Sequence, residues 1–280
     1  MIKNSIILSI LFLLILSPIG LVSQNKIQVQ NLQMESSIKS KVFKEELLPG
    51  ALADMRIEHI ALRGPQAHKI VLPADSTSLF LFVKGNATLK AGKKKFGIVP
   101  ESMALPFAFK SITINVPKGE TLHYAQFTKK VSEQDKVDFK SFPAENKYDI
   151  YFTRFSDCEP YTEKIKSPNT VSRTVLRADI VPRVALGTVQ TKGPDAVGAH
   201  EHPMLEQLFL GLAGNDIVVH ADEKSAELKE FSLLHIPLGS THWATVGEGK
   251  KMYYIWMDFF LTKEGQEWLK THKPINKKMN

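Results

Sequence analysis

The sequence predicts an all-β protein made of two similar β modules in tandem, with a short helix near the C-terminus. Short apolar runs alternate with turn residues, as in "SLFLFVKGNATLKAG" (78–92) and "FSLLHIPLGSTHWATV" (231–246). The run "LFLFVKGNATL" (79–89) also resembles "LFLGLAGNDIV" (208–218), so the chain repeats itself. Helical periodicity is confined to "LTKEGQEWLKTH" (261–272), where Thr262 can cap a helix.

Residues 1–23 have the layout of a secretory signal peptide. Lys3 precedes an apolar stretch from Ile6 to Leu16, and Pro18 and Gly20 follow before Ser23. The apolar stretch is shorter than the roughly 20 residues that a membrane-spanning helix needs. We therefore expect an exported protein, periplasmic or secreted, that keeps no membrane anchor after cleavage.

The composition argues against a disulfide-stabilised fold and against nucleic-acid binding. The single cysteine, Cys158, excludes an internal disulfide, so the fold depends on its apolar core, for which 280 residues with 43% apolar content suffice. The net charge of +7 comes from scattered lysines, without the aromatic interleaving of a nucleic-acid module. We expect no nucleic-acid partner and a mild preference for anionic small molecules.

The repeat sets the expected domain boundaries. A first module is expected over 24–131, a polar connector over 132–170, a second module over 171–260, and a helix with a tail over 261–280. A second match supports this division, because "VPKGETLHYA" (116–125) resembles "IPLGSTHWA" (236–244).

The two modules differ at four polar positions of the second one. In the first module, apolar or hydroxyl residues stand at the matching positions, so we expect at most one metal ion per chain. The matched pairs are His200 with Val71, His202 with Pro73, Glu206 with Thr77, and His242 with Leu122.

These four residues suit a metal site. His200 and His202 are two apart, so a strand would point both to the same side. Glu206 follows in the next stretch, and the Gly239 turn can aim His242 toward them. Three imidazoles and a carboxylate form a mixed nitrogen and oxygen site for a divalent first-row metal.

The residues resemble the two motifs of the cupin superfamily, G-x5-H-x-H-x3-4-E-x6-G and P-x-G-x2-H. The first motif is similar to His200-x-His202-x3-Glu206, with Gly214 one residue later than the pattern. The second matches Pro237-x-Gly239-x2-His242 without departure.

The resemblance implies a bicupin. Such a protein has two antiparallel β-barrels of the jelly-roll type, with the metal near the mouth of the second. The first barrel, which lacks the ligands, would serve packing, formation of a homodimer or the shape of the pocket. The metal would be Mn, Fe, Zn, Ni or Cu, with open coordination positions for substrate, water or dioxygen.

Further residues are candidates for substrate binding. Met204, Trp243, Tyr254 and Arg183 lie near the motif in sequence. The alternation of "KMYYIWMDFF" (251–260) places Tyr254 and Trp256 on one face. Core packing is the more common role for each of these aromatic residues, and a solvated side chain is the more common outcome for an arginine such as Arg183. No general acid or base can be identified.

Three functions fit these features. The first is a metal-dependent isomerase, lyase or decarboxylase acting on a small hydroxy acid, sugar or uronate. Because similar exported cupins occur in polysaccharide degradation, an anionic saccharide is a candidate substrate. The second is a dioxygenase that uses Fe, Cu or Ni, and the third is a non-catalytic module that binds a metal or a saccharide.

Overall fold

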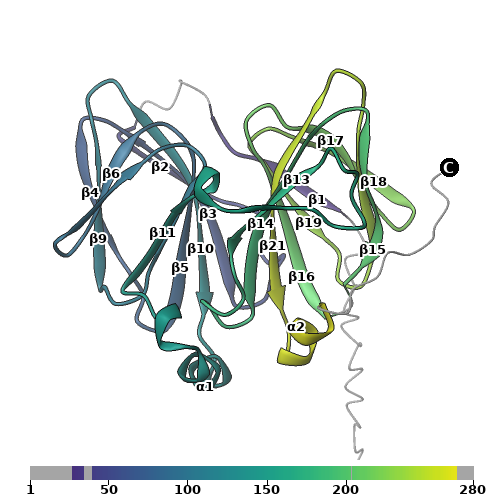
Figure 1. The fold of residues 1–280 in the computed structure, drawn as a ribbon. Helices are drawn as coiled ribbons and strands as arrows, with labels where there is room; N and C mark the ends of the chain where they lie inside the picture. Colours follow the sequence, from purple (N-terminus) through teal and green to yellow (C-terminus); the bar gives the residue numbers. More distant parts are fainter. Residues whose placement is uncertain (1–26, 35–39, 203, 270–280) are drawn as a thin grey trace, which may run out of the picture.

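The computed structural model describes residues 27–34, 40–202 and 204–269, and they form two β modules side by side (Figure 1). Every strand pairing in these ranges is antiparallel, apart from one isolated bridge between Asn215 and Lys251. The all-β prediction with a short C-terminal helix is confirmed. The predicted signal peptide and the tail beyond residue 269 lie outside the described residues.

The first module consists of two sheets that face each other. The six-stranded sheet has the order β11-β8-β5-β10-β3-β2, and the four-stranded sheet has the order β4-β9-β6-β7. The strands are β2 (Val42–Glu46), β3 (Met55–Arg63), β4 (Gln66–Val71), β5 (Ser76–Lys84), β6 (Ala87–Ala91), β7 (Lys94–Ile98), β8 (Ser102–Pro106), β9 (Ser111–Val116), β10 (Thr121–Lys130) and β11 (Ile150–Arg154).

The second module repeats this arrangement. Its sheets have the orders β1-β19-β16-β21-β14-β13-β12 and β15-β20-β17-β18, which match the first module strand for strand except for the added β12. The strands are β1 (Gln28–Asn31), β12 (Pro160–Tyr161), β13 (Val171–Leu176), β14 (Val184–Lys192), β15 (Asp195–Glu201), β16 (Leu205–Gly211), β17 (Asp216–Ala221), β18 (Lys224–Lys229), β19 (Ser232–Ile236), β20 (Thr241–Val246) and β21 (Lys251–Phe260).

The strand order changes one match between the repeats. It equates β20 with β9, because β20 pairs with β15 as β9 pairs with β4. His200 lies opposite His242 in the second module, and Ile70 lies opposite Ile112 at the same place in the first. The counterpart of His242 is therefore Ile112 and not Leu122, and the first module remains without polar ligands at this point.

The burial pattern of a strand depends on the sheet to which it belongs. In β9, β17 and β20 every second residue is buried, since only one face of each four-stranded sheet meets the interior. In β5, β10 and β21 most residues are buried, on both faces of the strand. One face of these strands covers the interior of its own module, and the other meets the neighbouring module in a shared apolar core.

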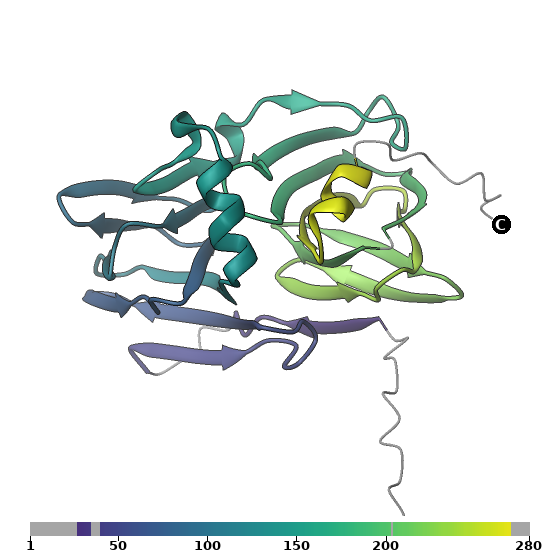
Figure 2. The ribbon, with the colours of Figure 1, turned by 90° about the horizontal axis from the view of Figure 1, so that it is seen from below.

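Two segments cross the predicted boundaries. Strand β1 precedes the first module in sequence but pairs with β19 of the second, and Figure 2 shows it running along that module. The predicted connector 132–170 is largely structured. It contains α1 (Glu133–Ser141), the 3-10 turns η1 (Ala144–Asn146) and η2 (Phe155–Asp157), and strands β11 and β12, which extend the first and second module respectively.

The short C-terminal helix α2 (Lys263–Leu269) lies at the same end of the molecule as α1 (Figure 1). The Thr262 hydroxyl accepts a hydrogen bond from the Gly265 amide at 3.2 Å, as expected of a helix cap. Among the described residues, no helix has the length and apolar character needed to cross a membrane.

Candidate metal centre

Three buried histidines meet where β15 and β20 pair. His200 on β15 lies directly opposite His242 on β20, and His202 follows just after β15 ends. The register of β15 shifts between Val197 and His200, which marks a bulge that re-aims the side chains beyond it. One ring nitrogen from each histidine lies within 4.8 Å of the other two.

Backbone carbonyls orient two of the rings. Nδ1 of His200 lies 2.7 Å from the Gly198 carbonyl oxygen, and Nδ1 of His242 lies 3.2 Å from that of Ser240. A ring whose Nδ1–H donates to a carbonyl presents the lone pair of Nε2 on its other side, which is the usual way of fixing a metal-binding histidine. The rings of His200 and His242 are therefore oriented to act as nitrogen ligands.

Glu206, predicted as the fourth ligand, does not join the histidines. Its Oε2 lies 3.0 Å from Nε2 of His235 on the adjacent strand β19. In β16, Glu206 lies opposite Phe259, which belongs to the apolar core between the modules. Since consecutive residues of a strand point to opposite faces, Glu206 points away from the metal centre.

Gln207 takes that position on the inner face of β16. Counted with four residues after His202, the cupin pattern reaches Gln207, and six further residues lead to Gly214. With Gln207 in place of Glu206, Gly214 therefore falls at the position that the cupin motif expects. The Nε2 of Gln207 donates to Oδ1 of Asp258 at 2.7 Å, whereas its buried Oε1 has no hydrogen-bond partner among the described residues.

The histidines open into a cavity of about 320 Å³ between the two sheets of the second module. Aromatic side chains form much of its wall, and charged groups line another part. The residues around it are Tyr161, Glu163, Ile165, Lys166, Thr174, Val189, Val197, His200, His202, Gln207, Phe209, Tyr254, Trp256 and Asp258.

Asp258 is the carboxyl group at the back of this cavity and is 3% exposed. Burial raises its pKa to about 7, because the charged form loses its hydration. The hydrogen bond from Gln207 opposes this rise, Glu163 adds to it, and the positive charge of Lys166 opposes it. The Asp258 carboxyl accepts the hydrogen bond from the Gln207 amide nitrogen. This contact fixes the orientation of the amide and leaves its oxygen available to the cavity.

The predicted substrate residues divide into one inside the cavity and three outside it. Tyr254 lines the cavity and stacks on Phe209 with ring centroids 4.6 Å apart. Met204 packs beneath α2, where its carbonyl accepts from the Leu261 amide. Trp243 lies on the other face of β20 and stacks on His220 at 4.7 Å, so neither residue contacts the cavity.

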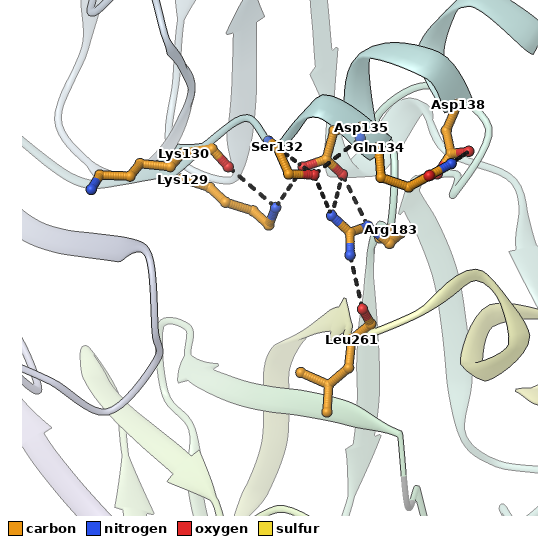
Figure 3. Close-up of polar contacts among 8 residues, drawn as sticks. All are labelled: Lys129, Lys130, Ser132, Gln134, Asp135, Asp138, Arg183 and Leu261. Carbon is orange, nitrogen blue, oxygen red and sulfur yellow. Dashed lines mark hydrogen bonds and ion pairs between the residues drawn. The ribbon is translucent and has the colours of Figure 1, made fainter.

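Arg183 contributes to the contact between the modules and is not part of this cavity. Its guanidinium donates to Oδ1 of Asp135 at 2.9 and 2.6 Å, to Ser132 Oγ and to the Leu261 carbonyl (Figure 3). Ser132 and Asp135 begin helix α1, so Arg183 joins that helix to the end of β21. The sequence places Arg183 near the motif, but it does not reveal that Asp135, 48 residues earlier, is the carboxylate that binds it.

Sequence reasoning missed Gln207, Asp258, Glu163 and Lys166. Gln207 was detectable from the position of Gly214, which favours the longer spacing of the motif. Asp258 is four residues beyond Tyr254 on the same face of β21 and was detectable by alternation. Glu163 and Lys166 lie in an irregular segment, and only the fold brings them to the histidines.

Comparisons with known proteins show the fold. No protein-family model matches the sequence, and no curated protein matches it. A cupin 2 conserved barrel domain protein from Leptotrichia buccalis aligns with a TM-score of 0.56 and 12% identity, covering 83% of this chain and 96% of that one. The protein Ylba from E. coli aligns with a TM-score of 0.63 and 12% identity, covering 85% and 93%.

An oxalate decarboxylase from Lactobacillus farciminis, solved as a formate complex, aligns with a TM-score of 0.60 and 12% identity. The alignment covers 87% of this chain and 90% of that one. At this identity the likeness is one of fold. The chain therefore has the fold of these cupin structures over most of its length.

Proposed function

We propose that this chain is a member of the cupin superfamily, and that its second module is a metal-dependent enzyme acting on a small hydroxy acid, sugar or uronate. One observation carries the proposal. Three buried histidines converge within 4.8 Å, and the unpartnered Oε1 of Gln207 lies on the wall of the same cavity. The fold shared with cupin structures supports it.

The donor set fits a divalent first-row metal. His200, His202 and His242 would supply nitrogen ligands, and Gln207 would supply an amide oxygen. A metal would also satisfy the Gln207 oxygen, which is otherwise a buried acceptor without a donor. The residues present therefore fit the group that the cupin motifs imply.

The ligands determine the charge of the centre. All four proposed ligands would be neutral, so they would not offset the charge of a divalent ion. A substrate that brings a carboxylate or another anionic oxygen would be favoured there. When bound, such a metal polarises a carbonyl or hydroxyl oxygen and so supports isomerase, lyase or decarboxylase chemistry.

The remaining residues orient the substrate and exclude water. Phe209, Tyr254 and Trp256 form an apolar wall that displaces water from the histidines. Asp258 holds the Gln207 amide in the orientation that presents its oxygen. We also propose that the protein is exported and meets an anionic saccharide outside the cytoplasm.

Metal analysis of four proteins tests the centre. We expect about one first-row metal ion per chain in the wild type. We also expect its loss in His242→Ala, and at least about a tenfold weaker affinity in Gln207→Met, which keeps the size of the side chain but removes the oxygen ligand. Glu206→Gln is the matched control and should keep the metal.

The possible outcomes are distinct. A wild type without metal, or a His242→Ala variant with full metal, would refute the metal centre. Loss of metal in Glu206→Gln but not in Gln207→Met would restore the ligand expected from the sequence. Iron or copper as the bound metal would favour oxygen-dependent chemistry over Lewis-acid chemistry.

A further inference from the structure

A short segment closes the open side of the cavity. Residues 161–166, called the strap here, leave the seven-stranded sheet at β12 and cross to the edge of β15. Lys166 forms an isolated bridge with Val197, and the Gly198 amide donates to the Ile165 carbonyl at 2.6 Å. The strap is therefore fastened two residues before His200.

The strap places an ion pair on the cavity wall. Nζ of Lys166 lies 2.7 Å from Oε2 of Glu163, and it donates to Oγ of Ser172 at 2.9 Å. The Lys166 side chain is only 5% exposed. An ammonium group has three donors, and the described residues supply acceptors for two of them.

This pair matches one chemical group particularly well. A hydroxyl can donate to the Glu163 carboxylate and accept from the Lys166 ammonium at the same time. A hydrocarbon chain can do neither, and a carboxylate can only accept. The Glu163 side chain is 36% exposed, whereas the Lys166 side chain is buried. A ligand without the matching group would displace water from the pair and leave the buried ammonium incompletely hydrogen-bonded, so the pair discriminates against such a ligand.

We infer that the strap makes the cavity selective for a hydroxylated carboxylate, with the Glu163–Lys166 pair as the recognition group for a hydroxyl. The inference rests on the proposed function, since the carboxylate would bind at the metal. Sugar acids and other polyhydroxy acids belong to this class, and simple fatty acids do not. The aromatic wall formed by Tyr254 and Trp256 suits the carbon backbone of such a ligand.

The strap also contains a residue that serves as a control for the substitution of Lys166. Lys164 lies between the two residues of the pair but is exposed and does not line the cavity. Lys164→Met and Lys166→Met therefore make the same chemical change on opposite sides of one segment. Glu163→Gln removes the charge of the other partner while retaining its size.

The experiment measures binding of D-gluconate and hexanoate by calorimetry, with the protein in the presence of Mn²⁺ and after metal removal. The two probes have the same carbon chain and differ chiefly in their hydroxyl groups. We expect the wild type to prefer D-gluconate by at least about tenfold. Lys166→Met and Glu163→Gln should each reduce this preference about tenfold, with the metal content unchanged, and Lys164→Met should leave it unaltered.

The preference ratio separates this inference from the metal centre. An equal preference in the wild type and both pair variants would overturn the role of the strap, even with a full complement of metal. A wild type that binds no Mn²⁺ would refute the proposed centre, whereas the ratio on the metal-free protein would still test the strap. Using two pair variants protects the test against a folding defect in either one.

Discussion

At the scale of single residues, one step along a strand separates the proposed metal ligand Gln207 from Glu206, which lies toward the apolar core. Glu206 and Gln207 are neighbours on β16, yet Glu206 bonds His235 toward the first module and Gln207 faces the histidine cluster. The consequence is chemical as well as geometric. An amide in place of a carboxylate would leave a metal bound at the proposed centre more positive, which would favour anionic substrates.

A second histidine cluster shows how burial controls charge. In the first module, Nδ1 of His59 lies 2.7 Å from Glu45, and Nε2 of His59 lies 3.2 Å from Nδ1 of His123. Burial, together with the nearby positive charges of His59 and Lys84, lowers the pKa of His123 to about 4. Both rings are nearly inaccessible, so the folded protein keeps His123 neutral in mild acid.

This cluster predicts a specific loss of stability in acid. Below about pH 6.5 the unfolded chain protonates His123, whereas the folded chain does not until about pH 4. The stability contributed by the neutral ring is therefore lost as the pH falls through this window. Between about pH 7 and pH 4.5 the loss is on the order of 2 kcal/mol, and it should be absent in His123→Gln.

Urea unfolding of both proteins at the two pH values measures this difference. Ionisable groups distant from His123 titrate alike in both proteins and cancel, so the difference reports the titration of His123 together with its coupling to His59. An equal loss of stability in the wild type and in His123→Gln would contradict the assignment.

At the scale of elements, helix α1 is held by a polar anchor at its first turn. Within this helix, Asp135 is the one buried residue. Asp135 accepts from the Ser132 amide and from Arg183, with Lys129 at 3.3 Å (Figure 3). Burial alone would raise the pKa of Asp135, but these hydrogen bonds and the Lys129 charge hold it below its usual value.

The anchor predicts that α1 depends on one carboxylate. Asp135→Ala removes the partner of Arg183, whose side chain is 16% exposed, and should cost about 2 kcal/mol of unfolding free energy. Asp138→Ala is the matched control on the same helix. The Asp138 carboxylate accepts a hydrogen bond from Gln134 on the helix surface, so its removal should cost less than about 0.5 kcal/mol.

Denaturant unfolding of both variants gives the two values. Combining Asp135→Ala with Arg183→Met in a double-mutant cycle then isolates the pair, with an expected coupling of about 1 kcal/mol or more. Equal effects of the two alanine substitutions would show that the helix does not rely on this pair.

At the scale of the whole molecule, the two modules share one apolar core. Leu81 and Met103 of the first module belong to the same buried cluster as Leu210 and Ile255 of the second. The Tyr253 hydroxyl also bonds the Glu101 carboxylate across the boundary at 2.5 Å. With β1 crossing between the modules, neither module buries its sheet independently.

The shared core predicts that both modules unfold together. Leu210→Ala removes a side chain that is 0% exposed and should cost about 3 kcal/mol while keeping a single transition. The three tryptophans all lie in the second half of the chain, so their fluorescence follows that module, whereas circular dichroism follows both. Two separate transitions in these signals would show that the modules are independent.

The sequence by itself determined the β character, the duplication and the histidine positions. These features follow from local patterns: alternation along a strand, turn residues between strands, and a run of the first module that recurs in the second. His200, His202 and His242 were found because the motif spacing keeps them together in any protein of this fold. Tyr254 was found because alternation along β21 is regular.

Only the tertiary structure decided which face of β16 meets the histidine cluster, which module receives β1, and which carboxylate binds Arg183. Alternation gives the relative orientation of residues within one strand, but the connection before the strand sets its phase. That phase moved the ligand from Glu206 to Gln207. Asp258, Glu163 and Lys166 come from distant segments, and their meeting at the histidines depends on packing between two sheets, which no local pattern encodes.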